Sequence, residues 1–177
     1  GTLQQPLSLF ALVNGLKYED MRPYDNGAEW LEGINAKQLL FDAMKMTGKQ
    51  PSQILPAIFY LSNDLYLLTM THEYGCRADD AEALTEATLC AREEIQQMVA
   101  GLRELGGIWK NMRVVATAES IGIRDGRRIK GIASVSKEDV LESRRYADEV
   151  CLVHFPMDVH AITPEVKSGY SYVGKTQ

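Results

Sequence analysis

The sequence has 177 residues, of which 45% are hydrophobic and 24% are charged. This length and this composition are typical of one folded domain with a single core, and they argue against a disordered chain. Lysines and arginines number 19 against 24 aspartates and glutamates, so the net charge is −5 and there is no excess of positive charge for binding nucleic acid. The apolar runs, such as residues 65–70, are far shorter than the roughly 20 residues that a membrane-spanning helix needs.

The three cysteines indicate a reducing environment. Cys76, Cys90 and Cys151 are widely spaced and include no C-x-x-C pair. An odd number of cysteines with this spacing argues against a disulfide framework and against a structural zinc site. We therefore expect a cytoplasmic protein without a bound metal.

The first elements in chain order are a strand and a helix. Residues 7–13 are rich in strand-forming side chains and are followed by an Asn-Gly turn signal. Residues 17–33 contain charges, a proline and aromatics without a regular period, which predicts an ordered loop. Asn35 then caps a helix whose apolar residues recur at helical spacing until Gly48.

A hairpin and a long helix follow. Residues 57–62 and 65–71 are β-prone runs separated by Asn-Asp, which predicts a tight hairpin. Asp79 or Asp80 then caps the most regular helix of the sequence, which ends at two glycines. The apolar side chains of this helix fall at steps of four and three, as expected for a face that packs on a sheet. They are Leu84, Thr88, Ala91, Ile95, Met98, Leu102 and Leu105.

The second half of the sequence predicts further strands and one short helix. Residues 113–118 and 121–123 have strand-forming composition, and an Asp-Gly turn leads into a returning strand over residues 127–132. A Ser-x-x-Asp capping box at residues 136–139 predicts the start of a short helix, and residues 150–160 predict another strand.

These strands and helices alternate without a regular β-α-β rhythm, which indicates an α+β fold. We expect residues 1–177 to form a single domain. In it, a mixed or largely antiparallel sheet packs against the long amphipathic helix and shorter helices.

The common catalytic signatures do not occur in the sequence. It contains no dinucleotide-binding G-x-G-x-x-G, no phosphate-binding G-x-x-x-x-G-K-[ST], no zinc-binding H-E-x-x-H and no G-x-S-x-G nucleophile elbow. The pair His72-Glu73 lacks a second histidine, so we interpret it as a polar pair at a strand end.

The first candidate site is a cluster of four cations around the Asp-Gly turn, namely Arg124, Arg127, Arg128 and Lys130. Guanidinium groups can hold a carboxylate or a pyrophosphate with paired hydrogen bonds. The simpler interpretation is a solvated hairpin, because Arg127 and Arg128 would point to opposite faces of a strand.

The second candidate site is the pair Asp158 and His160. Two positions apart on a strand, they would lie on one face and present a carboxylate and an imidazole to one cavity. Here the simpler interpretation is a polar pair on the surface.

Four segments of the chain share their order and spacing with one known family. They are a helical segment with an arginine at residues 91–95, the motif G-x-R-x-x-R-R-I-x-G at residues 122–131, V-S-x-x-D at residues 135–139 and D-x-H at residues 158–160. With these segments the chain resembles the FAD-dependent oxidoreductase family over about residues 84–160.

The resemblance implies that FAD is the cofactor of a longer parent protein. In such flavoproteins a glycine-rich strand, turn and helix hold the FAD diphosphate, and a second flavin-contacting segment follows the D-x-H motif. Neither occurs in this sequence, so the resemblance implies the substrate-binding or cap region of the parent. Its expected partners are the FAD-binding domain of the same polypeptide and a small-molecule substrate, and by itself it is expected to bind no FAD and to be inactive.

The same resemblance favours a functional role for both candidate sites. It implies that Arg124, Arg127 and Arg128 bind cofactor or substrate. It also implies that His160, oriented by Asp158 or another acceptor, exchanges a proton beside the flavin. The alternative function is a free-standing domain that binds an anionic ligand or another protein, with the arginines forming an anion pocket.

Overall fold

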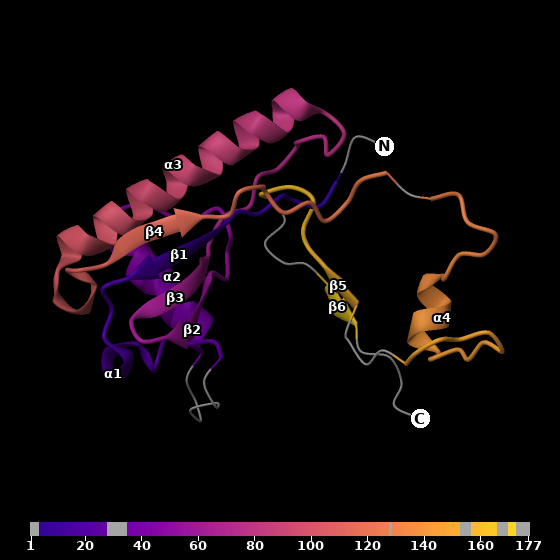
Figure 1. Ribbon diagram of the computed structural model, residues 1–177, viewed down its shortest axis with the longest axis horizontal. Helices are drawn as coiled ribbons and strands as arrows, with labels where there is room; N and C mark the ends of the chain where they lie inside the picture. Colours follow the sequence, from indigo (N-terminus) through magenta and orange to yellow (C-terminus); the bar gives the residue numbers. More distant parts are fainter. Residues whose placement is uncertain (1–3, 28–34, 128, 153–156, 166–169, 173–177) are drawn as a thin grey trace.

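A four-stranded antiparallel sheet forms the centre of the computed structural model, which describes residues 4–27, 35–127, 129–152, 157–165 and 170–172. Its strands lie in the order β2-β3-β1-β4 (Figure 1). They are β1 (Phe10–Asn14), β2 (Ala57–Ser62), β3 (Leu65–Thr69) and β4 (Arg113–Thr117). A separate antiparallel pair consists of β5 (Met157–Val159) and β6 (Tyr170–Tyr172). The expected α+β class and the largely antiparallel sheet are confirmed.

Two helices cover one face of the sheet. Helix α2 (Ala36–Lys45) packs against β2, helix α3 (Ala81–Leu105) packs against β4, and the two helices contact each other. Both begin as the sequence predicts, because the side chain of Asn35 caps α2 and that of Asp80 caps α3. The described helices include no candidate for a membrane span.

The apolar stripe of α3 forms much of the core. Ile95 and Leu102 are fully buried, as predicted, together with Ala91 and Met98. They join side chains of the sheet and of α2 in a single cluster that includes Leu7, Leu9, Val13, Leu40, Met44, Ile58, Tyr66, Leu68 and Met70. At its C-terminal end the stripe leaves the core, since Leu105 is exposed.

The β2–β3 hairpin turns at Asn63, as the sequence predicts. Asn63 has a φ of 53°, in the left-handed region that asparagine tolerates better than most residues. The pairing joins Ala57 to Thr69 at the open end of the hairpin. Because β1 also pairs with β3, Phe10 lies opposite Thr69 on the other side.

The predicted arginine hairpin is wrong. Among the described residues of 121–132 there is no strand, and Gly122 makes only an isolated bridge to Ser8. Ile129 and Ile132 are almost completely exposed, so no neighbouring strand covers them. A strand without a partner leaves its backbone groups to water, and alternating apolar residues alone do not stabilise it.

Two further expectations need correction, and a third is confirmed. Within the predicted loop of residues 17–33, a short helix α1 (Tyr18–Met21) forms, and residues 28–34 lie outside the described part. Of the predicted strand of residues 150–160, the described residues form a strand only in β5; residues 150–152 and 160 belong to no strand, and residues 153–156 lie outside the described part. The capping box at residues 136–139 does start a helix, α4 (Lys137–Leu141), which lies apart from the sheet in Figure 1.

The remaining described elements complete the frame around the sheet. A short 3-10 helix, η1 (Gly107–Trp109), follows α3 and buries Trp109.

All three cysteines are free thiols, with Cys76 half-buried and Cys90 and Cys151 exposed.

The chain just before β1 is held on both sides. Leu7 pairs with Glu73, and Ser8 pairs with Gly122. Leu9 has no backbone partner in these two bridges; its N–H donates to the hydroxyl of Thr71 (2.9 Å), and that hydroxyl donates to the Leu9 carbonyl (3.1 Å). One buried hydroxyl therefore satisfies both backbone groups of a buried residue.

Thr71→Val removes this hydroxyl with little change of shape. It leaves both backbone groups of Leu9 buried and unpaired, and each such group costs about 1–3 kcal/mol, so we expect a loss of ~2–6 kcal/mol in the free energy of unfolding. Urea denaturation measures this loss. The matched control is Thr85→Val on the exposed face of α3, expected to change stability by less than about 0.5 kcal/mol. Equal losses in the two variants would contradict the assigned role of Thr71.

Candidate functional site

Arg124 lies against the start of the chain. Its Nη1 donates to the carbonyl oxygen of Pro6 (2.9 Å) and to the Oγ of Ser8 (2.8 Å). Gly122, two residues before Arg124, forms an isolated bridge with Ser8 and so brings the segment of Arg124 beside residues 6–8. The charged head of an otherwise exposed side chain is therefore fixed in position.

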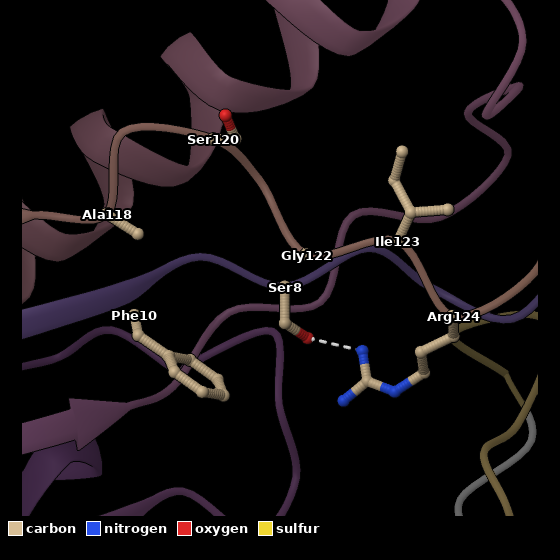
Figure 2. A pocket seen from close by; sticks show the side chains of 7 residues that line it. All are labelled: Ser8, Phe10, Ala118, Ser120, Gly122, Ile123 and Arg124. Carbon is tan, nitrogen blue, oxygen red and sulfur yellow. Dashed lines mark hydrogen bonds between the residues drawn. The ribbon is translucent and has the colours of Figure 1, made fainter.

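A pocket of about 260 Å³ opens beside this arginine. It is lined by Ser8, Phe10, Ala118, Ser120, Gly122, Ile123 and Arg124. In Figure 2 the Phe10 ring and the Arg124 guanidinium point to the same side of the chain, with Ser8 between them, whereas the Ser120 hydroxyl points away from the guanidinium. The pocket thus has an aromatic end and a cationic end.

His72 is the buried member of an imidazole pair. The residue is only 9% exposed, and its ring packs edge-to-face on His160 with ring centroids 5.1 Å apart and an interplanar angle of 90°. The Nδ1 of His72 lies 3.3 Å from the Tyr74 hydroxyl. The buried Nε2 has no hydrogen-bond partner among the described residues. Buried polar atoms are nearly always paired, so this nitrogen marks a position that needs an explanation.

The surroundings keep His72 uncharged. Burial, reinforced by the nearby Arg124 and His160, lowers the pKa of His72 to about 3. A neutral imidazole has one N–H donor and one acceptor nitrogen, so His72 can pass hydrogen bonds on but adds no charge of its own. Burial also raises the pKa of Tyr74, against the opposing effect of Arg124, and so keeps its hydroxyl protonated.

His160 follows β5 directly and is tied to the same N-terminal segment. Its backbone N–H donates to the Oε1 of Gln5 (2.8 Å). The backbone N–H of Gln5 donates in turn to the Oδ2 of Asp125 (3.0 Å), the residue next to Arg124. Gln5 therefore connects the two candidate sites that the sequence suggested separately.

The structure brings some of the predicted site residues together. Arg124 and His160 both lie close enough to His72 to affect its pKa. Arg127 is exposed and acts instead on Asp79, whose pKa is lowered mainly by its hydrogen bond to another arginine and least by Arg127. Arg128 lies outside the described residues, and so does the side chain of Asp158, although the backbone of Asp158 belongs to β5.

The sequence interpretation missed His72, which it treated as part of a polar pair. A signal was available in the order of the strands. If β1 pairs antiparallel with β3, the residues before Phe10 must lie beside those after Thr69, as they do. That register places Ser8 and His72 beyond the same end of the paired strands β1 and β3.

A second polar network anchors His72 to α3. Its backbone N–H donates to the Oγ of Ser52 (2.7 Å). Ser52 donates through both its N–H and its Oγ to the carboxylate of Glu94, each at 2.7 Å. Beside this network, burial and the charge of Glu94 raise the pKa of Glu73 to about 7.

The N-termini of the two longest helices, α2 and α3, do not fit an FAD diphosphate. Anion sites of this kind need backbone N–H groups without a partner at the start of a helix. In α2 the Asn35 side chain occupies the N–H of Gln38, and in α3 the Asp80 carboxylate occupies those of Glu82 and Ala83. The acidic cap of α3 would also repel a phosphate. Within the described part of the chain there is likewise no group of ligands for a metal ion.

The raised pKa of Glu73 predicts a pH-dependent cost in stability. With a pKa of about 7 in the folded state against an ordinary 4.5, the folded protein binds this proton more tightly, so stability falls as pH rises between these values. Glu73→Gln mimics the protonated form. We expect the variant to unfold at a higher urea concentration than the parent at about pH 8 and at the same concentration at about pH 4.

The control for this measurement is Glu119→Gln, at an exposed position. The difference between that variant and the parent should not change with pH. A constant difference for Glu73→Gln as well would contradict the raised pKa.

Comparison with known proteins gives one match. The model of the family described as FAD dependent oxidoreductase matches residues 2–177. Neither the curated proteins nor the solved structures contain a significant match to the chain. The matched range covers almost the whole sequence and includes the four segments whose order and spacing resemble the same family. The chain belongs to the FAD dependent oxidoreductase family.

Proposed function

We propose that this chain is the substrate-binding part of an FAD-dependent oxidoreductase and that it works with an FAD-binding domain of the same polypeptide. The observation that carries the proposal is that His160 packs on the buried ring of His72, while Arg124, which lines a pocket, lies close enough to His72 to lower its pKa. In this family the flavin supplies the redox chemistry. Side-chain caps occupy the N-termini of α2 and α3, and this supports a role in binding and orienting a substrate rather than in holding the FAD diphosphate.

Each residue of the site has a chemical task in this proposal. Arg124 attracts and orients an anionic group, because its guanidinium is charged at every physiological pH and is fixed by Pro6 and Ser8. His160 donates or accepts a proton, since an imidazole ring has both a donor and an acceptor nitrogen in its neutral form. His72 stays neutral and supports the ring of His160 by edge-to-face packing.

The role of His160 is tested in the FAD-loaded protein that contains this chain. A panel of small hydroxy acids and alcohols is mixed with the enzyme, and the compound that reduces the flavin fastest is used for comparison. His160→Ala should slow flavin reduction by ~10²–10⁴-fold, the usual effect of losing a positioned acid or base. Stopped-flow absorbance measures the rate, and a melting curve checks the fold.

Arg103→Gln, at an exposed position on α3, is the control and should keep the parental rate. Parental rates in the His160→Ala enzyme would reject the proposed catalytic part. A free-standing binding domain would then be the better description.

A second test concerns the isolated chain of 177 residues. Because side-chain caps occupy the N-termini of α2 and α3, we expect purified protein to lose added FAD during gel filtration and to be colourless. Visible absorbance is recorded across the protein peak. Yellow protein with flavin absorbance at this peak would show that the chain holds the cofactor without another domain.

A further inference from the structure

We propose that residues 129–152, the outer arm, form the surface on which the FAD-binding domain of the same polypeptide docks. This inference rests on the proposed function and adds the place where that domain makes contact. Helix α4 and the segments on either side of it extend away from the sheet (Figure 1). The outer arm therefore offers a surface that the core of this chain does not use.

The outer arm has no apolar core of its own. Within this described range Asp139 is the one buried residue, and Leu141 and Ser143 are half-buried. The exposed residues include five branched aliphatic side chains, whose exposure runs from 71% to 110%: Ile129, Ile132, Val135, Val150 and Leu152. Single exposed apolar residues are ordinary, but a group as exposed as this one marks an interaction surface.

Polar contacts hold α4 in shape. The Asp139 carboxylate accepts from the backbone N–H of Ser136 (2.8 Å) and pairs with the Arg144 guanidinium (2.6 Å). The Ser136 hydroxyl accepts in turn from the N–H of Asp139 (3.1 Å). These contacts order the helix without burying an apolar side chain, so the apolar surface of the arm stays available to a partner.

The chain as a whole exposes more surface than a compact monomer. Its accessible surface is 12095 Å², whereas a compact monomer of 19.8 kDa exposes about 8,600 Å². The difference exceeds the roughly 600–1,500 Å² that a contact between two domains of one chain buries. The chain thus has enough uncovered surface for a contact with a whole domain.

The position of the outer arm selects the FAD-binding domain as its partner. The arm begins five residues after Arg124 and ends eight residues before His160. Gln5 joins the two ends, because it hydrogen-bonds to Asp125 and to the backbone of His160. In the proposed function the flavin lies beside His160. The domain that carries the flavin must then approach the point from which the arm extends.

The charge at the start of the arm suits the same partner. Residues 127–135 contain two arginines, one lysine and no acidic residue, so their net charge is +3, whereas the rest of the chain carries −8. This positive charge attracts an anionic surface, and the diphosphate of FAD is anionic. A second copy of the chain is also acidic outside the arm, so the oligomeric state is part of the test.

Hydrogen exchange, measured by mass spectrometry, compares the purified 177-residue chain with the FAD-loaded protein that contains it. Residues 129–135 and 150–152 lie outside helices and strands, so we expect their amides to exchange rapidly in the chain alone. A docked domain should slow this exchange at least about tenfold. Residues 47–49, which follow α2, should exchange alike in both proteins. Equal exchange of the arm in the two proteins would overturn the proposal.

A double variant, Ile132→Gln with Leu152→Gln, removes apolar surface from the arm without adding charge. In the chain alone it should unfold at the parental urea concentration, because both side chains are already exposed. In the FAD-loaded protein it should lower the melting temperature by at least about 3 °C, because both side chains would be buried there. The matched control, Met46→Gln with Leu89→Gln at other exposed positions, should leave both measurements unchanged. A parental melting temperature of the arm variant in the FAD-loaded protein would count against the docking surface.

Light scattering on the chain alone tests the other occupant. We expect a monomer. A dimer whose arm is already protected from exchange would assign the surface to a second copy and overturn the proposal.

The docking surface and the proposed function can fail separately. If the arm exchanges alike in both proteins while His160→Ala slows flavin reduction, the docking surface is wrong and the proposed function stands. If the arm is protected in the FAD-loaded protein while His160→Ala keeps the parental rate, the docking surface stands and the catalytic role of His160 fails.

Discussion

The hydrogen bonds of residues 7–9 are the constraint on which both the sheet and the site depend. In an extended chain, successive residues direct their backbone groups to opposite neighbours. Leu7 and Leu9 bond to residues 71–73. Ser8, between them, bonds to Gly122 through both its N–H (3.1 Å) and its carbonyl (2.8 Å). All three residues are buried, so each of these groups must find a partner.

This alternation determines where the functional side chains lie. His72 lies within residues 71–73, the segment that bonds to Leu7 and Leu9. Arg124 lies two residues after Gly122, which bonds to Ser8. Gln5 lies two residues before residues 7–9. Its side chain accepts a hydrogen bond from the backbone N–H of His160, and its own backbone N–H donates to Asp125. His72 and Arg124 are 52 positions apart in the sequence, and Arg124 and His160 are 36 positions apart. They lie near one another because one short stretch of backbone lies between their segments.

Local signals in the sequence predicted the elements, and long-range pairing determined the site. The caps at Asn35 and Asp80 and the apolar stripe of α3 are readable because their causes lie within a few residues. The arginine hairpin failed for the opposite reason. Its alternating pattern needed a neighbouring strand, and the carboxylate of Asp125, which was interpreted as a turn signal, binds Gln5 instead. In the same way, no spacing rule could pair His72 with His160 before the strand order was known.

The burial that positions His72 also couples it to any anion bound nearby. Removal from water and the proximity of Arg124 lower the pKa of His72 to about 3, so the folded protein excludes a second positive charge from this position. A carboxylate placed at Arg124 would offset part of that repulsion and would raise the pKa of the imidazole. Anion binding and protonation of His72 are therefore thermodynamically linked, and each must favour the other by the same factor. The neutral state of His72 comes first from its removal from water, so a bound acid would offset only the smaller contribution of Arg124.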